Sequence, residues 1–252
     1  MSDHLPATPA WPPRSAPRLF VATPLSEGLQ VPVDGPQAHY LARVMRVGID
    51  DAVILCDNIS GEWATRAVHV GKRDLVLECV SLLREREDVP DFTLCAALLK
   101  KDRFDLVLEK ACELGVARIQ PVLTRRCVAD KLNLERARAT LTEAAEQCAR
   151  TALPEIAEPV KLDALLRAWP EQRALFFADE LGGAPAAASF GAHKGPAALL
   201  TGPEGGFTDE ERAAIRALPQ ASAITLGPRI LRGETAAIGA TALWMGLSGD
   251  WA

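Results

Sequence analysis

Residues 195–240 read GPAALLTGPEGGFTDEERAAIRALPQASAITLGPRILRGETAAIGA and contain two strand–loop–helix units in succession. A first apolar run ends in TGPEGG, and a second ends in LGPRILRGE. Thr208, followed three residues later by Glu211, is the capping-box pattern that begins a helix, and a helix of small residues is expected from about Glu234. Because glycine-rich turns at the carboxyl ends of strands lie where open α/β sheets bind ligands, these two loops are the first candidate site.

The chain before this stretch, from residue 91 onward, alternates between short apolar runs and amphipathic segments. Strands are expected at 92–99, 118–123 and 173–178, and helices at 104–114, 134–151 and 162–169. The Ala- and Gly-rich segment from Gly182 to Gly195 is expected to be a loop. Strands that alternate with helices predict a parallel α/β sheet covered on both faces.

The amino-terminal third has a different pattern. Residues 17–84 predict a small β-barrel domain of three to five strands with one short helix at 35–45. A charged run before Pro90 indicates a linker, so the second domain is expected to span 90–252. The Pro-rich residues 1–16 predict a disordered tail and do not resemble a signal peptide.

Composition excludes some classes of protein and leaves others open. Hydrophobic residues make up 48% of the 252 residues, and no apolar run approaches the roughly 20 residues of a membrane span. The net charge of −5 does not indicate a nucleic-acid binder, although residues 89–150 carry +2. Six cysteines without a C-x-x-C pair favour buried thiols in a reducing cytoplasm over disulfides or a metal site.

The two loops match none of the common nucleotide-binding patterns. Neither the P-loop sequence nor G-x-G-x-x-G is present, and no Ser-His-Asp set or metal-ligand cluster emerges elsewhere. Either loop alone could be an ordinary turn between a strand and a helix, but two within 30 residues favour a ligand site.

Several segments together resemble a known family. ALLTGPEGGFTDEE and ITLGPRILRGETAAIGATAL within 198–243 resemble the carboxyl-terminal motifs of the RsmE family of the SPOUT superfamily. EKACELGVARIQPVLTRRCV (109–128) and EAAEQCARTALPEI (143–156) resemble its central motifs. RLFV and HYLARVMRVGIDDAVILCDNISGEW, within 18–63, resemble its small amino-terminal domain. The resemblance covers about residues 18–247.

The resemblance implies a fold and a cofactor. Members of the family carry a deep trefoil knot at the carboxyl terminus, where the two glycine loops hold S-adenosylmethionine, and they form homodimers. The final helix, with Ala236, Ala237, Gly239 and Ala240, is expected to pack closely against another backbone. The residues expected to bind the cofactor are Leu200, Thr201, Gly202, Pro203, Glu204, Gly205, Gly206, Leu226, Gly227, Ile230 and Leu231. No metal is implied.

The implied reaction is methylation of a uridine N3 in 16S ribosomal RNA of the small subunit. Uracil N3 must lose its proton, so a fixed positive charge near the flanking carbonyl oxygens would help. The candidate catalytic residues are Arg126, Arg150 and Arg232. The alternative role for Arg126 and Arg150 is a surface salt bridge. The alternative for Arg232 is to brace Glu234 or Glu204 by pairing with it. The small domain resembles a PUA-like RNA-docking module, for which the candidate phosphate contacts are Arg18, Arg43, Arg46 and Arg66.

Two other functions remain open at this point. One is a non-catalytic RNA- or ribosome-binding protein on a knotted scaffold, against which the two intact loops argue. The other is a small-molecule enzyme of the doubly wound class that uses a different nucleotide. The sequence does not indicate which nucleotide is modified or which group accepts the N3 proton.

Overall fold

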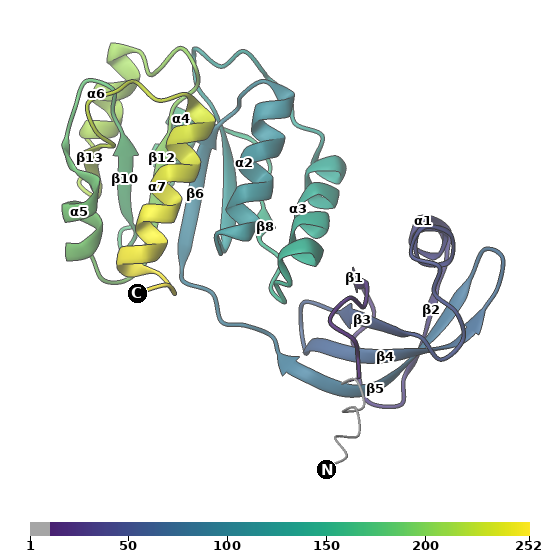
Figure 1. Cartoon of the computed structure of the whole chain (residues 1–252). Helices are drawn as coiled ribbons and strands as arrows, with labels where there is room; N and C mark the ends of the chain where they lie inside the picture. Colours follow the sequence, from purple (N-terminus) through teal and green to yellow (C-terminus); the bar gives the residue numbers. More distant parts are fainter. Residues whose placement is uncertain (1–10) are drawn as a thin grey trace, which may run out of the picture. The chain divides into compact units, whose positions relative to one another are not determined.

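The computed structural model describes residues 11–252, which form two compact units (Figure 1). The first unit comprises the described residues up to Glu87 together with the short segment Ala149–Ala152. The second comprises Asp88–Cys148 and Leu153–Ala252. Most of the tail predicted at 1–16 lies outside the described residues.

A five-stranded sheet forms the first unit. Its strands pair in the order β1-β3-β4-β5-β2, parallel between β1 and β3 and antiparallel elsewhere. A short helix and a π-helical turn occupy the predicted helical segment, and β2 was not predicted. Leu41, Leu55 and Leu77 are fully buried in its core. The elements are β1 (Arg18–Phe20), β2 (Gln30–Val33), α1 (Gly35–His39), η1 (Tyr40–Val44), β3 (Ala52–Cys56), β4 (Gly61–Val70) and β5 (Leu75–Glu85).

Glu87 binds the segment that returns to the first unit. Its Oε1 accepts hydrogen bonds from the backbone N–H groups of Thr151 (2.8 Å) and Ala152 (3.0 Å), and its own N–H donates to Thr151 Oγ1 (2.8 Å). Ala149 has φ 58°, which a helix does not tolerate, so the preceding helix ends at Cys148, before the predicted residue 151.

A parallel sheet forms the centre of the second unit, as the sequence predicts. The strand order is β11-β13-β10-β12-β6-β7-β8, with β9 also paired to β7, and every pairing is parallel. The strands are β6 (Phe92–Ala97), β7 (Arg118–Leu123), β8 (Glu155–Ile156), β9 (Val160–Lys161), β10 (Ala174–Ala178), β11 (Ala184–Pro185), β12 (Ala197–Thr201) and β13 (Ala221–Thr225).

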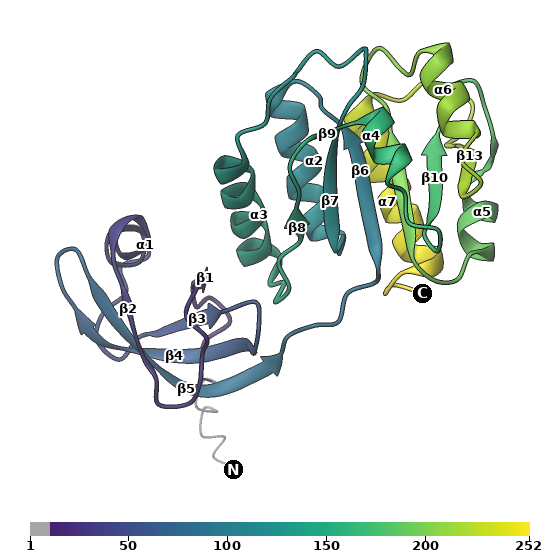
Figure 2. The same ribbon diagram turned by 180° about the vertical axis from the view of Figure 1, so that it is seen from behind.

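Helices cover both faces of this sheet. Figure 1 shows α2, α3, α5 and α7 on the near face, and Figure 2 shows α4 and α6 on the opposite face. Phe92 and Trp244 stack on the near side with ring centroids 4.1 Å apart, whereas Phe177 and Phe207 belong to the core cluster beneath α4 and α6. The helices are α2 (Lys101–Glu113), α3 (Leu134–Cys148), α4 (Leu162–Arg167), α5 (Ala186–Ala192), α6 (Asp209–Arg216) and α7 (Gly233–Ser248).

The prediction of a loop over Gly182–Gly195 was wrong. Strand β11 and helix α5 occupy most of this segment. Phe190, on α5, is fully buried and contacts Phe176 edge-on with ring centroids 5.1 Å apart. The apolar pattern of AAASFGA is weak, because Phe190 is the one large side chain that this helix buries, so the sequence did not indicate a helix here.

The six cysteines are free thiols, of which Cys56, Cys79, Cys95 and Cys112 are buried. Burial raises the pKa of Cys95 to about 12, so its thiol stays protonated. Among residues 11–252, no helix is long and apolar enough to cross a membrane.

Candidate active site

A cavity lies at the carboxyl edge of the second unit's sheet, where β10, β12 and β13 end. Three loops and the first turn of α7 form its wall, which includes the TGPEGG and LGPRILR loops identified in the sequence. The lining residues are Ala178, Asp179, Glu180, Gly202, Pro203, Gly206, Ile224, Thr225, Leu226, Gly227, Pro228, Arg229, Ile230, Leu231, Gly233 and Ala236. Parallel α/β sheets bind their ligands at this edge.

Gly206 brings the first loop against an acidic side chain. Its φ of +66° lies in the left-handed region, and a Cβ at this position would meet Glu180 Oε1 at 2.5 Å. Glycine adopts this backbone conformation without strain, and a larger residue would also have to displace Glu180. The carboxylate of Glu180 therefore lies directly against the backbone of the TGPEGG loop at the cavity wall.

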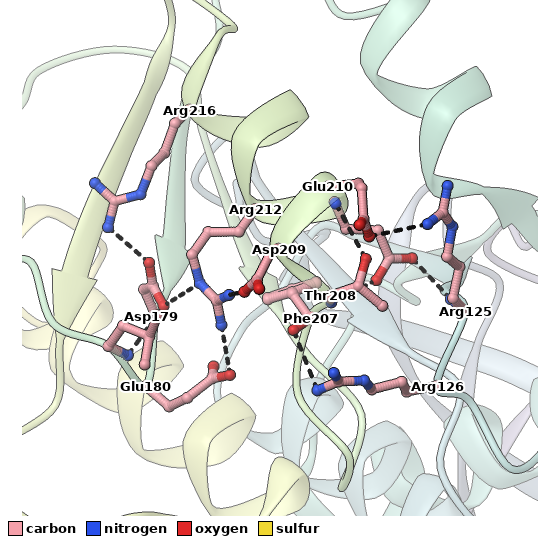
Figure 3. A network of polar contacts seen from close by, with 12 residues as sticks. Arg125, Arg126, Asp179, Glu180, Phe207, Thr208, Asp209, Glu210, Arg212 and Arg216 are labelled. Carbon is pink, nitrogen blue, oxygen red and sulfur yellow. Dashed lines mark hydrogen bonds and ion pairs between the residues drawn. The ribbon is translucent and has the colours of Figure 1, made fainter.

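An ion-pair network holds Glu180 in place (Figure 3). Arg212, on α6, donates to Glu180 Oε1 (2.6 Å) and to Asp179 Oδ1 (2.9 Å), and Arg216 donates to Asp179 Oδ2 (2.7 Å). Burial by itself would raise the pKa of Asp179. The hydrogen bonds from the Leu181 N–H and the two arginines outweigh that effect and hold the pKa below its usual value.

The amino terminus of α6 is fixed by a second set of contacts in Figure 3. Thr208 and Glu211 form the predicted capping box, and Glu211 also accepts the Arg125 N–H (2.7 Å). Arg126 Nη1 donates to Gly205 O (2.8 Å). The TGPEGG loop is thus tied to the loop after β7 as well as to its own helix.

The start of α7 approaches the TGPEGG loop closely. A Cβ on Gly233 would lie 2.8 Å from Leu99 Cδ2 and 3.2 Å from Gly202 O, so a side chain has no room there. Glu234 is buried and pairs with Arg103 of α2. The side chain of Arg232 is exposed and has no hydrogen bond or ion pair within residues 11–252, so it does not brace Glu234 or Glu204.

Of the predicted cofactor-binding residues, seven line the cavity: Gly202, Pro203, Gly206, Leu226, Gly227, Ile230 and Leu231. Leu200 and Thr201 are buried inside β12, and neither Glu204 nor Gly205 reaches the cavity wall. Ile230 lines the cavity although 90% of its surface is exposed, so its side chain lies at the mouth.

Asp179 and Glu180 also line the cavity, and neither was predicted from the sequence. They directly follow β10, which ends at Ala178. The available signal was their position, because two acids directly after a buried strand lie at the same sheet edge as the glycine loops. Their arginine partners lie more than 30 residues away on α6, and only the folded chain brings them together.

The remaining predicted arginines all lie in the first unit. Arg150 is buried beside Glu87, with Nε 3.6 Å from the carboxylate. Arg18 forms an ion pair with Glu62 (2.7 Å), and Arg66 lies over the ring of Trp11, 5.5 Å from its centroid. Arg43 and Arg46 are exposed at the end of η1. No cluster of three or more potential metal ligands occurs in the described part of the chain.

Comparisons with known proteins define the class. The family described as "RNA methyltransferase domain" matches residues 85–245, which is more than half of the chain. The family described as "RNA methyltransferase PUA domain" matches residues 33–78 in the first unit. The chain is therefore an RNA methyltransferase by its two domains.

Curated relatives and solved structures identify the family more closely. The chain is 34% identical to ribosomal RNA small subunit methyltransferase E of Synechocystis, over 87% of this chain and 74% of the relative. The corresponding protein of Neisseria gonorrhoeae, solved bound to S-adenosyl methionine, is 28% identical with a TM-score of 0.84, over 94% of this chain and 100% of that one. A Legionella pneumophila methyltransferase in complex with its cofactor SAM is also 28% identical, with a TM-score of 0.83 over 93% and 99%. The chain belongs to the ribosomal RNA small subunit methyltransferase E family.

Proposed function

We propose that this protein transfers a methyl group from S-adenosylmethionine to N3 of a uridine in 16S ribosomal RNA of the small subunit. The main support is that the two glycine loops meet in one cavity at the carboxyl edge of the sheet. Family membership supports the same reaction class. An ordinary pair of turns would not require both loops to line a shared cavity.

The residues of the cavity fit this cofactor. Gly202 and Gly206 line the cavity without a side chain to fill it, and neither position has room for one, because a Cβ would meet the Phe207 ring at the first and Glu180 at the second. Backbone groups at this edge suit the hydrogen-bonding edge of adenine, and Leu226 and Leu231 supply apolar contacts. The carboxylate of Glu180 would accept hydrogen bonds from hydroxyl or ammonium groups. When bound, S-adenosylmethionine supplies a methyl group on a positively charged sulfonium.

The arginines would act on the nucleophile. Arg232 precedes the cavity-lining Gly233 and keeps its guanidinium free of partners in the described chain, which suits a group that stabilises negative charge on the uracil oxygens. Arg126 would hold the TGPEGG loop through Gly205 O and present its remaining donors to the RNA. The burial of Arg150 beside Glu87 supports a structural role in the first unit.

The path of the chain after β13 supports the trefoil knot that the resemblance implies. Strand β13 pairs with β10 on the side away from β12, yet the following helix α7 packs on β12 and β6. Residues 226–232 lead to Gly233 at the start of α7, where an added Cβ would lie only 3.2 Å from Gly202 O of the TGPEGG loop. A chain that threads through its own loop, as a trefoil knot requires, is rare in proteins. An experimental density map that traces this segment without threading would contradict the proposal.

The first unit would dock the substrate. We place a PUA-like RNA-docking domain, which the resemblance describes as a β-barrel, at residues 17–84 and the methyltransferase domain at 90–252. Arg43 and Arg46 are exposed and suit phosphate contacts, and Arg66 keeps its charge at the surface above Trp11. Arg18 is paired with Glu62, so only part of its positive charge would be available to the RNA. Because the proposed substrate is ribosomal RNA, we expect the enzyme to act in the cytoplasm.

A homodimer is part of the proposal. Ala237 and Ala240 face the protein's own core, so they do not form the contact surface. The opposite stripe of α7 exposes Thr235, Gly239 and Gly246. A stripe of small side chains allows the backbone of a second copy to approach closely.

The test combines cofactor binding with product analysis. Calorimetric titration with S-adenosylmethionine should show micromolar affinity. Small subunits from cells that lack the gene should gain a methylated uridine when they are incubated with the protein and the cofactor, and mass mapping of nucleosides detects it. Absence of cofactor binding would favour the alternative, a non-catalytic RNA-binding protein. Cofactor binding without nucleoside methylation would overturn the proposed substrate.

A further inference from the structure

A second cavity in the methyltransferase unit has no role in the proposed reaction. It has a volume of about 310 Å³ and lies where β6 ends and where α2 and α3 begin. Leu98, Leu99, Phe104 and Leu132 supply apolar wall, and the polar lining residues are Lys101, Lys131, Asn133 and Arg136. The cavity thus combines an apolar wall with a cationic rim.

Lysine is scarce in this protein, and its distribution is uneven. The chain has seven lysines, of which Lys101 and Lys131 line the cavity and Lys100 lies beside it in sequence. All three are exposed, and none of their ammonium groups forms an ion pair or hydrogen bond within residues 11–252. Asp102 follows Lys101 and Asp130 precedes Lys131 in the chain, but neither aspartate lines the cavity.

The other polar groups of the cavity have partners that define what they can still bind. Arg136 is engaged by Asp105 of α2 (2.6 Å), so its charge is partly neutralised. Asn133 Oδ1 accepts the Arg136 N–H (2.9 Å), which leaves the amide NH₂ as a donor at the cavity wall. The helix α2 has no capping side chain at its amino terminus. The site therefore offers donors and positive charge.

This cavity lies next to the proposed cofactor cavity. Leu99 lines the second cavity, and its Cδ2 is 2.8 Å from where a Cβ on Gly233 would be. Gly233 lines the cofactor cavity. The ion pair between Arg103 and Glu234 connects α2, which borders the second cavity, to α7, which borders the cofactor cavity. The two cavities are thus neighbours, since Leu99 of one lies against Gly233 of the other.

We propose that the second cavity binds a single-stranded nucleotide of the RNA substrate next to the methylated uridine. Its base would contact Leu99 and Leu132, the amide of Asn133 would donate to a base carbonyl, and Lys101 and Lys131 would hold the phosphate. Unstacked bases with their phosphates are the usual target of sequence-specific RNA recognition, and an apolar wall with a cationic rim suits them. This inference rests on the proposed function, since it assigns a substrate subsite to the same enzyme.

The experiment compares three substitutions with the same charge change. Lys101→Glu and Lys131→Glu alter the cavity, whereas Lys194→Glu alters an exposed lysine before β12, at the opposite edge of the parallel sheet. Binding of a short uridine-containing single-stranded RNA is measured by fluorescence anisotropy over a series of salt concentrations. Each cavity variant should bind about tenfold more weakly, with a salt dependence shallower by about one unit of slope. Lys194→Glu should bind like the wild type.

Calorimetric titration with S-adenosylmethionine separates this inference from the proposed function. All variants should keep wild-type cofactor affinity. Cavity variants that bind RNA like the wild type, or a Lys194→Glu variant that loses as much affinity as they do, would overturn the nucleotide site. Absence of cofactor binding by the wild type would instead overturn the proposed function.

Discussion

At the scale of single residues, some charged side chains near the cavity form ion pairs within the protein, and others have no such partner and can bind a ligand. Asp179 and Glu180 pair with Arg212 and Arg216 beside the proposed cofactor cavity. Arg232 has no such partner in the described chain, although it stands next to the cavity. A free guanidinium at a ligand site points to a substrate contact, whereas a buried network points to the support of neighbouring groups.

Arg232→Ala should lower turnover by about 100-fold, because it removes a charge that stabilises the developing anion. Steady-state methylation of small subunits measures this, and calorimetry should show cofactor affinity close to the wild type. Arg232→Lys should recover part of the activity. Arg167→Ala, which removes a surface i,i+4 pair with Asp163, is the control and should leave turnover unchanged. Equal losses in turnover and cofactor affinity would contradict a role in the chemical step.

Asp179→Asn should destabilise the protein by about 3 kcal/mol at neutral pH, because it leaves two arginines without their shared buried partner. The pKa of Asp179 is lowered in the folded state, so its stabilisation is complete above the ordinary value of 3.8 and is lost as pH falls through the lower folded-state value. Urea unfolding of both proteins at several pH values should therefore show the difference shrinking below about pH 4. A difference that stays constant would refute this linkage.

At the scale of elements, loops determine the site and helices hold the loops. The TGPEGG loop is fixed by Glu180, by Arg126 and by the capping box of α6. The LGPRILR loop ends where α7 begins, and there Gly233 has no room for a side chain. Rigid loops of this kind are prepared for a ligand before it binds.

Gly206→Ala should weaken S-adenosylmethionine binding by about tenfold, since an added Cβ in the left-handed region is strained by roughly 1–2 kcal/mol and displaces the Glu180 carboxylate. Calorimetric titration measures the loss. Gly191→Ala is the matched control, because Gly191 lies inside α5 with nothing within 4 Å of its added Cβ. That variant should bind normally and gain up to about 1 kcal/mol of stability. Equal affinity in the two variants would show that the approach of Gly206 to Glu180 does not matter for binding.

At the scale of the whole molecule, the chain forms two units with different tasks. The segment Ala149–Ala152 belongs to the first unit although the residues on both sides belong to the second. The chain therefore crosses between the units several times. The exposed stripe of α7 lies on the second unit and is available to a second copy.

Gly239→Glu should convert the proposed dimer to a monomer, because a charged side chain would be buried between the two copies. An added Cβ at Gly239 meets nothing within 4 Å in its own chain, so the fold should be retained. Light scattering after size-exclusion chromatography measures the mass, and circular dichroism confirms folding. Gly191→Glu is the matched control on α5 and should stay dimeric. A wild-type protein that runs as a monomer would remove the dimer from the proposal.

The sequence by itself determined the parallel α/β sheet, the capping box at Thr208 and the two glycine loops, because all of these depend on local patterns of apolar, capping and turn residues. It failed at α5, where the periodicity is weak and one buried phenylalanine anchors the helix. Only the tertiary structure brought Glu180 and Arg212 together and placed Lys101 and Lys131 in the lining of one cavity, since these pairs are 32 and 30 residues apart in the chain. Contacts between distant residues depend on strand order, and a local pattern does not encode strand order.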